Sequence, residues 1–259
     1  MRPVLAVTNV SKDFMGLRAV QNVSLSVPPG LITAVIGPNG AGKTTLFNCI
    51  SGFVAADASE STMLDRSGHE TLLAGLSPEA ICRLGIARTF QQTRVFDSLS
   101  VLDNVVLGCL TPEPLGIGRA FLDRMTGNRR HSALQDRARR LLEPVGLSSQ
   151  ETVLAGSLDH GSRRRLEIAR AVATDPLVLL LDEPAAGMNP IEKERLAVIL
   201  KELCSGGMAV LLIEHDMRLV TGISSIVYVM DHGELIASGP PQDVVRNERV
   251  VEAYLGRRH

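Results

Sequence analysis

Alternating hydrophobic and polar positions begin the chain and predict two half-buried antiparallel strands. The pattern runs through residues 4–8 and returns at 20–27, after a turn expected at 15–16. The uninterrupted apolar run 31–36 predicts a strand that is buried on both faces. A Gly-rich segment follows this strand and leads into the apolar stretch 46–53, which we expect to be helical.

The middle of the chain has mostly helical spacing. Ser100 has the residue type of a helix N-cap and stands directly before an apolar-periodic segment. The expected elements are, in order, strands and loops over 54–76, a helix from Pro78, helices over 101–110, 129–145 and 163–173, and a Gly- and Pro-rich excursion over 111–127.

An alternation of strands and helices then resumes. The expected elements are strands over 177–181, 208–213 and 226–230, a hairpin over 231–237, and helices over 190–204 and 242–254. This order predicts an α/β fold with a parallel-sheet core, an N-terminal antiparallel β subdomain and an inserted α-helical subdomain. We place the core and β subdomain at 1–98 and 176–259, and the helical subdomain at 99–175, within a single domain.

Composition argues against several classes of protein. With 45% hydrophobic and 21% charged residues, the 259-residue chain is globular rather than disordered. A net charge of -1, no Trp and two Tyr argue against a cationic or base-stacking face, so we expect no nucleic acid partner. The four cysteines lack CxxC spacing, which favours reduced thiols over a metal or disulfide framework.

The chain also lacks the sequence features of membrane insertion. Its first residues have no apolar core of a signal peptide, and no apolar run reaches the length of a bilayer span. We therefore expect any work at a membrane to be done from its surface, through a partner.

Residues 37–44 read GPNGAGKT and match the phosphate-binding pattern G-x-x-x-x-G-K-[ST]. In such a P-loop, backbone amides turn toward the phosphates, Lys43 reaches the β- and γ-phosphates, and the Thr44 hydroxyl binds Mg²⁺. A chance Gly-rich turn is disfavoured by the strand before it and the helix after it. We expect ATP and Mg²⁺ here, bound by Gly37, Pro38, Asn39, Gly40, Ala41, Gly42, Lys43, Thr44 and Thr45.

Two carboxylates end the apolar run 177–181. Because ligands bind at the carboxyl ends of parallel strands, Asp182 can hold the magnesium and Glu183 can act as general base toward water. An exposed acidic pair at a strand end is the alternative, and the P-loop upstream makes it the weaker one.

Two further polar residues are candidates for contact with the γ-phosphate. His215 follows the strand 208–213, where an imidazole can contact the phosphate or order the water and Glu183. Gln91 can touch both magnesium and water through its amide. Taken alone, a histidine is more often structural, and the Gln pair 91–92 indicates only a polar loop.

Together these residues resemble the ATP-binding cassette (ABC) family over nearly the whole chain. The resemblance implies a P-loop NTPase cassette that hydrolyses ATP with Lys43 in contact with the phosphates. The implied roles are adenine stacking for Phe14, the Q-loop for Gln91, the Walker B pair for Asp182 and Glu183, the switch histidine for His215, and the D-loop for 185–190. On sequence alone, Phe14 is equally well explained as an ordinary apolar strand end.

The motifs GIARTFQ, RRLEIARA, DEPAAGMNP, IEHDM and VVEAYLG resemble one subfamily, the larger ATPase of branched-chain amino acid importers. That resemblance implies a second ABC ATPase in a heterodimer, with a homodimer as the alternative. It also implies two membrane permeases, an external substrate-binding protein and a peripheral position on the cytoplasmic face of the inner membrane. The loop after Gln91 is the expected surface of transmission to the permeases.

The chain departs from the family at its signature, which is usually Leu-Ser-Gly-Gly-Gln and faces the nucleotide of the opposite subunit. Residues 158–162 read LDHGS, so Gly161 is kept while Asp159 replaces the serine. An ionised Asp159 about 5 Å from a phosphate charge would cost roughly 3 kcal/mol at an effective dielectric near 20. Alternatively, the nearby arginines 163–165 offset part of this cost, or Asp159 points away or stays protonated, or it serves only as a helix N-cap.

These observations predict an asymmetric pair of ATP sites. The site built on Lys43, Glu183 and His215 has all its residues, whereas the site completed in trans by Asp159 is impaired. Two other classes stay open at this point. A cassette ATPase acting on DNA or ribosomes is expected to carry a coiled coil or paired cassettes, which this chain lacks. A weakly catalytic regulatory subunit is consistent with Asp159.

Overall fold

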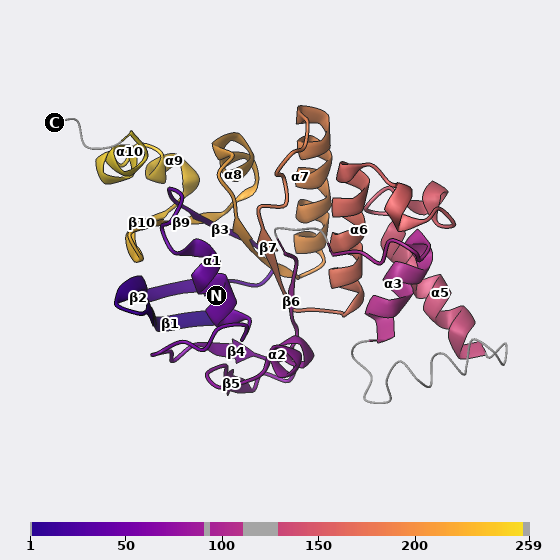
Figure 1. The fold of residues 1–259 in the computed structure, drawn as a ribbon, viewed down its shortest axis with the longest axis horizontal. Helices are drawn as coiled ribbons and strands as arrows, with labels where there is room; N and C mark the ends of the chain where they lie inside the picture. Colours follow the sequence, from indigo (N-terminus) through magenta and orange to yellow (C-terminus); the bar gives the residue numbers. More distant parts are fainter. Residues whose placement is uncertain (1, 91–93, 111–128, 256–259) are drawn as a thin grey trace.

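The computed structural model describes residues 2–90, 94–110 and 129–255. A six-stranded sheet forms the centre of the molecule, with an antiparallel sheet against one face and helices against the other (Figure 1). A lobe of helices projects from one side of this core, in the right half of the view (Figure 1). The α/β fold expected from the sequence is confirmed.

The central sheet has the strand order β10-β9-β3-β8-β7-β6. All neighbouring pairs are parallel except the hairpin of β9 and β10, so five strands end at one edge. Its strands are β3 (Ile32–Ile36), β6 (Ile86–Arg88), β7 (Val178–Asp182), β8 (Ala209–Ile213), β9 (Ile226–Asp231) and β10 (Glu234–Gly239). That edge therefore places the P-loop, Asp182 and His215 next to one another.

The antiparallel β subdomain has the order β2-β1-β4-β5. Its strands are β1 (Leu5–Phe14), β2 (Leu17–Val27), β4 (Thr62–Leu64) and β5 (Glu70–Leu72). The expected turn between the first two is confirmed, because Phe14 pairs with Leu17 across Met15 and Gly16. Both turn residues have positive φ, 47° and 89°, as a two-residue hairpin of this twist requires.

Side chains of alternate strand residues fill two separate cores. In β7, Val178 and Leu180 face α1 (Lys43–Ile50) and the antiparallel sheet, whereas Leu179 and Leu181 face α6, α7 and α8. The last three helices span His160–Ala173, Pro190–Ser205 and Met217–Ile223. Each fully buried aliphatic side chain stabilises the fold by about 1.5–3 kcal/mol, so the continuous apolar strands dominate the core.

The helical lobe consists of α3 (Val101–Leu110), α5 (Arg129–Leu142) and α6, with its own core cluster. The N-cap role expected for Ser100 is confirmed, since its Oγ accepts a hydrogen bond from the Asp103 N–H at 3.0 Å. Two short 3₁₀ turns, Ser148–Gln150 and Ala155–Ser157, connect α5 to α6. Leu166 of α6 packs in the lobe and Ile168 packs against the sheet, so α6 joins the two bodies.

Several helix bounds differ from those expected. α1 begins at Lys43 and ends before Gly52, whose φ of +74° is left-handed. α5 ends at Leu142 rather than 145, because the chain reverses at Gly146 with φ +65°. α6 begins at His160, three residues early, because Asp159 caps it.

The prediction of a single helix over 242–254 is wrong. The chain forms α9 (Pro241–Val244) and α10 (Glu248–Leu255) instead, and α2 (Pro78–Leu84) completes the helices described. The break lies at Asn247, whose side-chain oxygen accepts the Arg249 N–H at 3.0 Å and starts the second helix. No helix within the described ranges has both the length and the hydrophobicity to cross a membrane.

Candidate nucleotide site

The P-loop follows β3 and enters α1 at a backbone geometry that only glycine fits. Gly42 has φ +97°, and a Cβ there would lie 2.2 Å from the Ala19 carbonyl oxygen. A Cβ on Gly37 would lie 2.0 Å from the Met230 carbonyl oxygen. The Lys43 ammonium donates to the carbonyls of Gly37 at 2.8 Å and Pro38 at 2.9 Å, within the loop. The loop therefore turns around its own lysine at the N-terminus of α1.

A cleft of about 670 Å³ opens over this loop. Phe14 from the β1–β2 hairpin lines it together with Glu183 from the end of β7. Phe14 is 45% exposed, with the Lys12 ammonium 5.4 Å from its ring centre. The P-loop part of the lining consists of Asn39, Gly40, Ala41, Gly42, Lys43, Thr44 and Thr45. Phe14, the P-loop and Glu183 are distant from one another in sequence, yet they share one cavity. Its size suits a nucleotide.

Two of the cleft residues that the sequence did not indicate have basic side chains. Arg18 lines the cleft from β2, and His232 lines it from the β9–β10 turn. His232 has a φ of 45°, which the tight turn imposes. Neither residue belongs to a spaced motif, so only the fold brings them to the phosphate loop.

Asp182 is buried at the end of β7, beside the lysine of the P-loop. Its Oδ2 lies 3.2 Å from Nη2 of Arg88. Burial raises the pKa of the Asp182 carboxyl, and the Arg88 guanidinium opposes that shift. Burial lowers the pKa of Lys43, against the charges of Glu183 and Asp182. The two carboxylates and the lysine are therefore close enough to interact electrostatically.

Glu183 has a left-handed backbone, with φ 48°, directly after the strand. Its N–H donates to the Ile213 carbonyl at 3.0 Å, which holds the turn against the end of β8. Its Oε1 lies 3.9 Å from Nδ1 of His215, whose side chain is exposed. The structure thus brings His215 next to Glu183, which lines the cleft.

The buried Glu214, next to His215, also belongs to this arrangement. Its Oε1 accepts the Ala185 N–H at 2.9 Å and its Oε2 accepts the His215 N–H at 3.1 Å. One carboxylate therefore holds the segments that follow Glu183 and precede the helix α8. Sequence reasoning missed this role, although an acidic residue at a strand end beside a candidate histidine could have drawn attention.

The donor groups fit a magnesium ion shared with phosphates. Within the residues that the structure describes, no cluster of three or more His, Cys, Asp or Glu side chains could hold a metal alone. Mg²⁺ is usually held by one or two protein oxygens, with water and phosphate oxygens completing its octahedron. The Thr44 hydroxyl and the Asp182 carboxylate are oxygen donors of that kind. Gln91, the third expected ligand, lies outside the described residues.

Asp159 and Gly161 do not line the P-loop cleft of their own chain. The N-cap role of Asp159 is confirmed, because its Oδ1 accepts the Ser162 N–H at 2.8 Å and its Oδ2 accepts the Ser162 hydroxyl at 2.9 Å. The backbone hydrogen bond from Ser162 is the main cause that lowers the Asp159 pKa. These hydrogen bonds favour the charged form of the exposed Asp159 side chain in the isolated chain.

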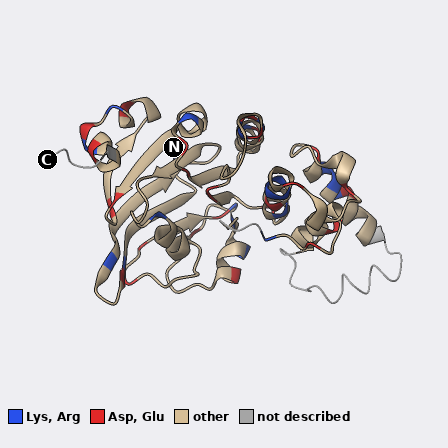
Figure 2. Cartoon of the chain, turned by 45° about the horizontal axis from the view of Figure 1, so that its top comes forward, with Lys and Arg blue, Asp and Glu red and all other residues tan. Residues whose placement is uncertain are grey.

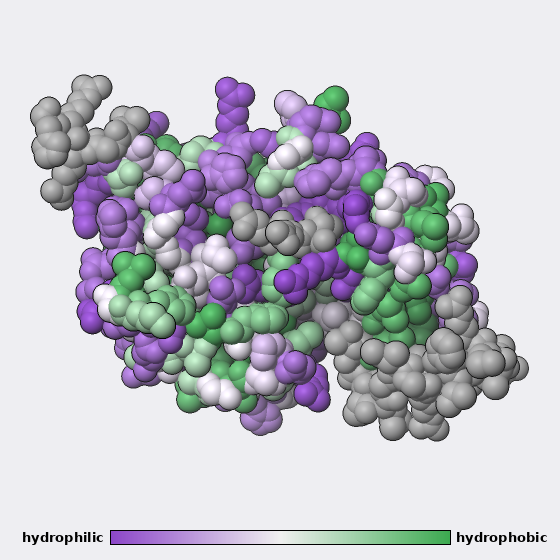
Figure 3. Space-filling model, in the orientation of Figure 1, coloured by the Kyte–Doolittle hydropathy of each residue, from purple (hydrophilic) through white to green (hydrophobic). Residues whose placement is uncertain are grey.

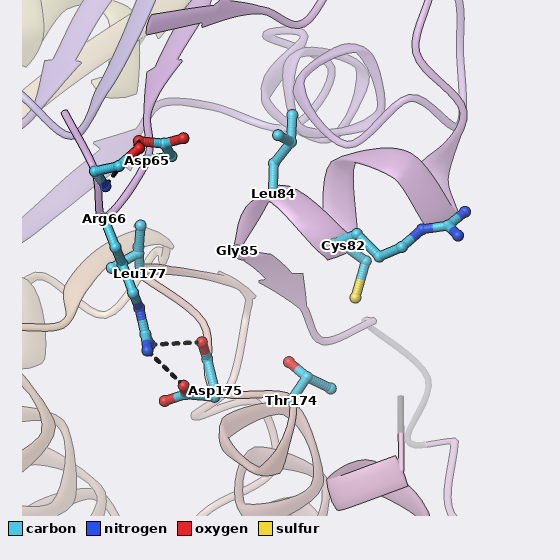
Figure 4. Close-up of a pocket in the computed structure, with 10 residues that line it drawn as sticks. Asp65, Arg66, Cys82, Leu84, Gly85, Thr174, Asp175 and Leu177 are labelled. Carbon is cyan, nitrogen blue, oxygen red and sulfur yellow. Dashed lines mark hydrogen bonds and ion pairs between the residues drawn. The ribbon is translucent and has the colours of Figure 1, made fainter. Parts of the chain in front are cut away.

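A second cleft, of about 510 Å³, lies between the β4–β5 turn, α2 and the link from α6 to β7 (Figure 4). Arg66 reaches across it and contacts Asp175 twice, at the carboxylate at 2.7 Å and the carbonyl at 3.0 Å. This ion pair connects the β subdomain to the end of α6, and it is exposed to solvent.

Comparison with known proteins agrees with this geometry. The family model described as ABC transporter matches residues 20–186, which include the P-loop, Asp182 and Glu183. The chain belongs to the ABC transporter ATPase family. A second model, described as branched-chain amino acid ATP-binding cassette transporter, matches residues 234–259.

Full-length relatives of this ABC ATPase are transporter subunits. The chain is 42% identical to the high-affinity branched-chain amino acid transport ATP-binding protein LivG of Escherichia coli K12, over 98% of both chains. It is 38% identical to BraF of Pseudomonas aeruginosa, also over 98% of both. Its fold matches an ABC transporter cassette solved in an ADP conformation, with TM-score 0.84, 31% identity, and coverage of 99% of this chain and 100% of the other.

These findings establish the enzymatic class. The chain is a nucleotide-binding ABC ATPase that hydrolyses ATP, and the relatives reported above are named as transport ATP-binding proteins. The family and activity expected from the sequence are confirmed.

Proposed function

We propose that this ATPase energises the import of branched-chain amino acids from the cytoplasmic face of the inner membrane, to which it is bound peripherally. The full-length similarity to LivG and BraF carries the proposal, and the match at 234–259 to a model for the same transporters supports it. A lipopolysaccharide export ATPase of Escherichia coli, LptB, is also similar, at 34% identity over 97% of both chains. Export is therefore the outcome that a transport assay must separate from import.

The residues of the cleft divide the work of hydrolysis. Phe14 stacks on the adenine, and the amides of residues 37–45 hold the phosphates with Lys43. Glu183 accepts a proton from the attacking water, while His215 beside it contacts the γ-phosphate and orients that water. Thr44, Asp182 and Gln91 would hold a Mg²⁺ ion, which would supply charge neutralisation to the bound phosphates.

The assay that tests this function is uptake by the assembled transporter. The chain should co-purify with two permeases and a second ABC ATPase as a heterodimer, with a homodimer as the alternative. In proteoliposomes with the external binding protein, ATP should drive uptake of labelled leucine, isoleucine or valine. ATP-dependent movement of another solute class only, or of lipopolysaccharide outward, would refute the import assignment.

A groove of about 660 Å³ between the core and the helical lobe supports a permease partner. Aromatic side chains line it, including Phe53 and Phe96, which are about half exposed. Arg94 lies over the ring of Phe90 with its guanidinium carbon 4.5 Å from the ring centre. Hydrophobic residues gather over the α3 part of the lobe (Figure 3), whereas basic and acidic residues are interspersed along the rest of the described chain (Figure 2). An apolar permease segment with a few polar groups fits this groove.

Replacing Phe96 with Asp should uncouple the permease without affecting nucleotide binding. If the bound permease buries Phe96, loss of this aromatic contact should cost at least about 2 kcal/mol of binding free energy. Permease affinity should then fall roughly 30-fold. Val198→Asp, at a similarly exposed apolar position on α7, is the control. It should change neither permease affinity nor nucleotide binding. Co-purification of permease with Phe96→Asp at the wild-type level would place the docking surface elsewhere.

The Asp159 carboxylate supports the proposal that the trans site is impaired. It is ionised and exposed at the N-terminus of α6, where the family's serine would face the partner's γ-phosphate. Because its oxygens are bound by Ser162, it withdraws one helix N–H from any phosphate. This chain would then supply a complete site of its own and a weakened signature to its partner.

Asp159→Ser should raise ATPase activity of the assembled ATPase pair, because serine keeps the cap while removing the charge. Asp159→Ala is the matched control, since it removes the charge and the cap together and should cost about 1 kcal/mol of stability. The folded-state pKa of Asp159 lies below its usual value of 3.8, so this stability contribution is present above pH 3.8 and is lost in stronger acid. An unchanged rate in both variants would leave Asp159 as a cap only.

A further inference from the structure

Arg164 is a buried arginine in the middle of the run 163–165 on α6, with 2% of its side chain exposed. Its neighbour Arg163 pairs with Asp97 near the surface, and Arg165 binds the carbonyls of Val145 and Gly146 in the lobe. Arg164 instead points away from the lobe and reaches the catalytic edge of the sheet.

One side of the Arg164 guanidinium holds the turn that carries the two carboxylates. Its Nη2 donates to the carbonyl oxygens of Asp182 and Glu183, both at 2.9 Å. Glu183 adopts its left-handed φ of 48° between these bonds and the bond from its own N–H to Ile213. Since this backbone is disfavoured for a residue with a side chain, it persists only where the surroundings fix it.

The other side of the guanidinium holds the peptide that precedes Gln91. Its Nη1 donates to the Phe90 carbonyl at 2.5 Å and to Oε2 of Glu167 at 2.8 Å. The second oxygen of Glu167 accepts the Phe90 N–H at 3.2 Å. Arg164 and Glu167, one helical turn apart, therefore bind both polar groups of Phe90.

We propose that Arg164 is a positioning residue for hydrolysis, which fixes the backbone of Glu183 and ties it to the segment at Phe90. The proposal rests on the general-base role proposed for Glu183. It also gives the groove at Phe90 and Glu167 a rigid connection to the catalytic turn, through one side chain of α6.

The geometry requires arginine rather than positive charge alone. A guanidinium presents donors on both terminal nitrogens, Nη1 and Nη2, of a planar fork, whereas a lysine ammonium is a point charge with three donors. Lysine at 164 keeps the charge beside Glu167 but cannot bind both segments at once. Because displacement of a catalytic group by about 1 Å can cost roughly 100-fold in rate, the loss should appear in the chemical step.

The test compares Arg164→Lys with Arg165→Lys in the full chain, by single-turnover hydrolysis of ATP and by equilibrium binding of ATP. Arg164→Lys should lower the hydrolysis rate roughly 10- to 100-fold with ATP affinity within twofold of wild type. Arg165→Lys changes an arginine on the same helix that also binds backbone carbonyls, and it should leave the rate within about threefold.

The outcomes test the positioning role of Arg164 separately from the general-base role of Glu183, on which it rests. A rate for Arg164→Lys within threefold of wild type, or a loss shared equally by Arg165→Lys, overturns the positioning role. Glu183→Gln is measured alongside. If Glu183→Gln keeps the wild-type rate, the premise fails. If Glu183→Gln loses it while Arg164→Lys does not, only the present inference fails. Should Arg164→Lys bind no ATP, a purely structural role is indicated and the proposal is refuted.

Discussion

Replacing Glu183 with glutamine should lower the rate constant for ATP hydrolysis by roughly 100- to 10,000-fold, the range typical of a lost general base. The amide has the shape of the carboxylate but cannot accept the proton of the attacking water. ATP binding should persist, because the P-loop and Phe14 do not depend on this side chain. The backbone of Glu183 should also be preserved, since its N–H and carbonyl are bound by Ile213 and Arg164.

Single-turnover hydrolysis and equilibrium ATP binding, measured on the same preparation, separate the two effects. Glu234→Gln, an exposed change at the start of β10, is the control for removal of one negative charge. It should retain the wild-type rate. A Glu183→Gln protein that still hydrolyses ATP at the wild-type rate would remove Glu183 from the role of base and leave water activation to another group.

The parts of the molecule that depend on local patterns could be predicted from the sequence. The strand at 31–36 and the P-loop GPNGAGKT are adjacent in sequence, so predicting their arrangement requires no knowledge of long-range contacts. The same holds for Asp182 and Glu183, which end a continuous apolar strand. The joining of these segments was also predictable, because parallel strands of one sheet share their carboxyl edge.

The buried arginines could not be predicted, because their partners are distant in sequence. Arg164 lies 74 residues from Phe90, and Arg88 lies 94 residues from Asp182. A run of three arginines on a helix is typical of a solvated face, and nothing in its spacing separates Arg164 from its neighbours. The predicted starts of the helices after Asp159 and Asn247 were also wrong. In both cases one capping side chain sets where the helix begins.

Arg88→Met is expected to have the largest effect on stability. Arg88 and Asp182 have side chains 6% and 3% exposed, and the same guanidinium binds Asn48 at 2.7 Å and Ser51 at 2.8 Å. Its carbon also lies 5.3 Å from the ring centre of Phe90. Removing Arg88 takes away the main counter-charge of the buried Asp182 carboxylate, at a cost of about 3–5 kcal/mol. Thermal unfolding should then shift downward by roughly 6–20 °C for a chain of this size.

The matched control is Arg66→Met, which removes an ion pair with Asp175 whose side chains are more than half exposed. Such a surface pair contributes at most about 1 kcal/mol to stability, so Arg66→Met should shift the unfolding temperature only slightly. The double variant Arg88→Met with Asp182→Asn should unfold at a higher temperature than Arg88→Met alone, because it leaves no unpaired buried charge. Equal shifts for Arg88→Met and Arg66→Met, or simple additivity in the double variant, would show that the Arg88–Asp182 pair does not couple β6 to β7. Recovery in the double variant would instead show that the main stabilising role of Arg88 is to balance the buried charge of Asp182, the carboxylate proposed to hold Mg²⁺.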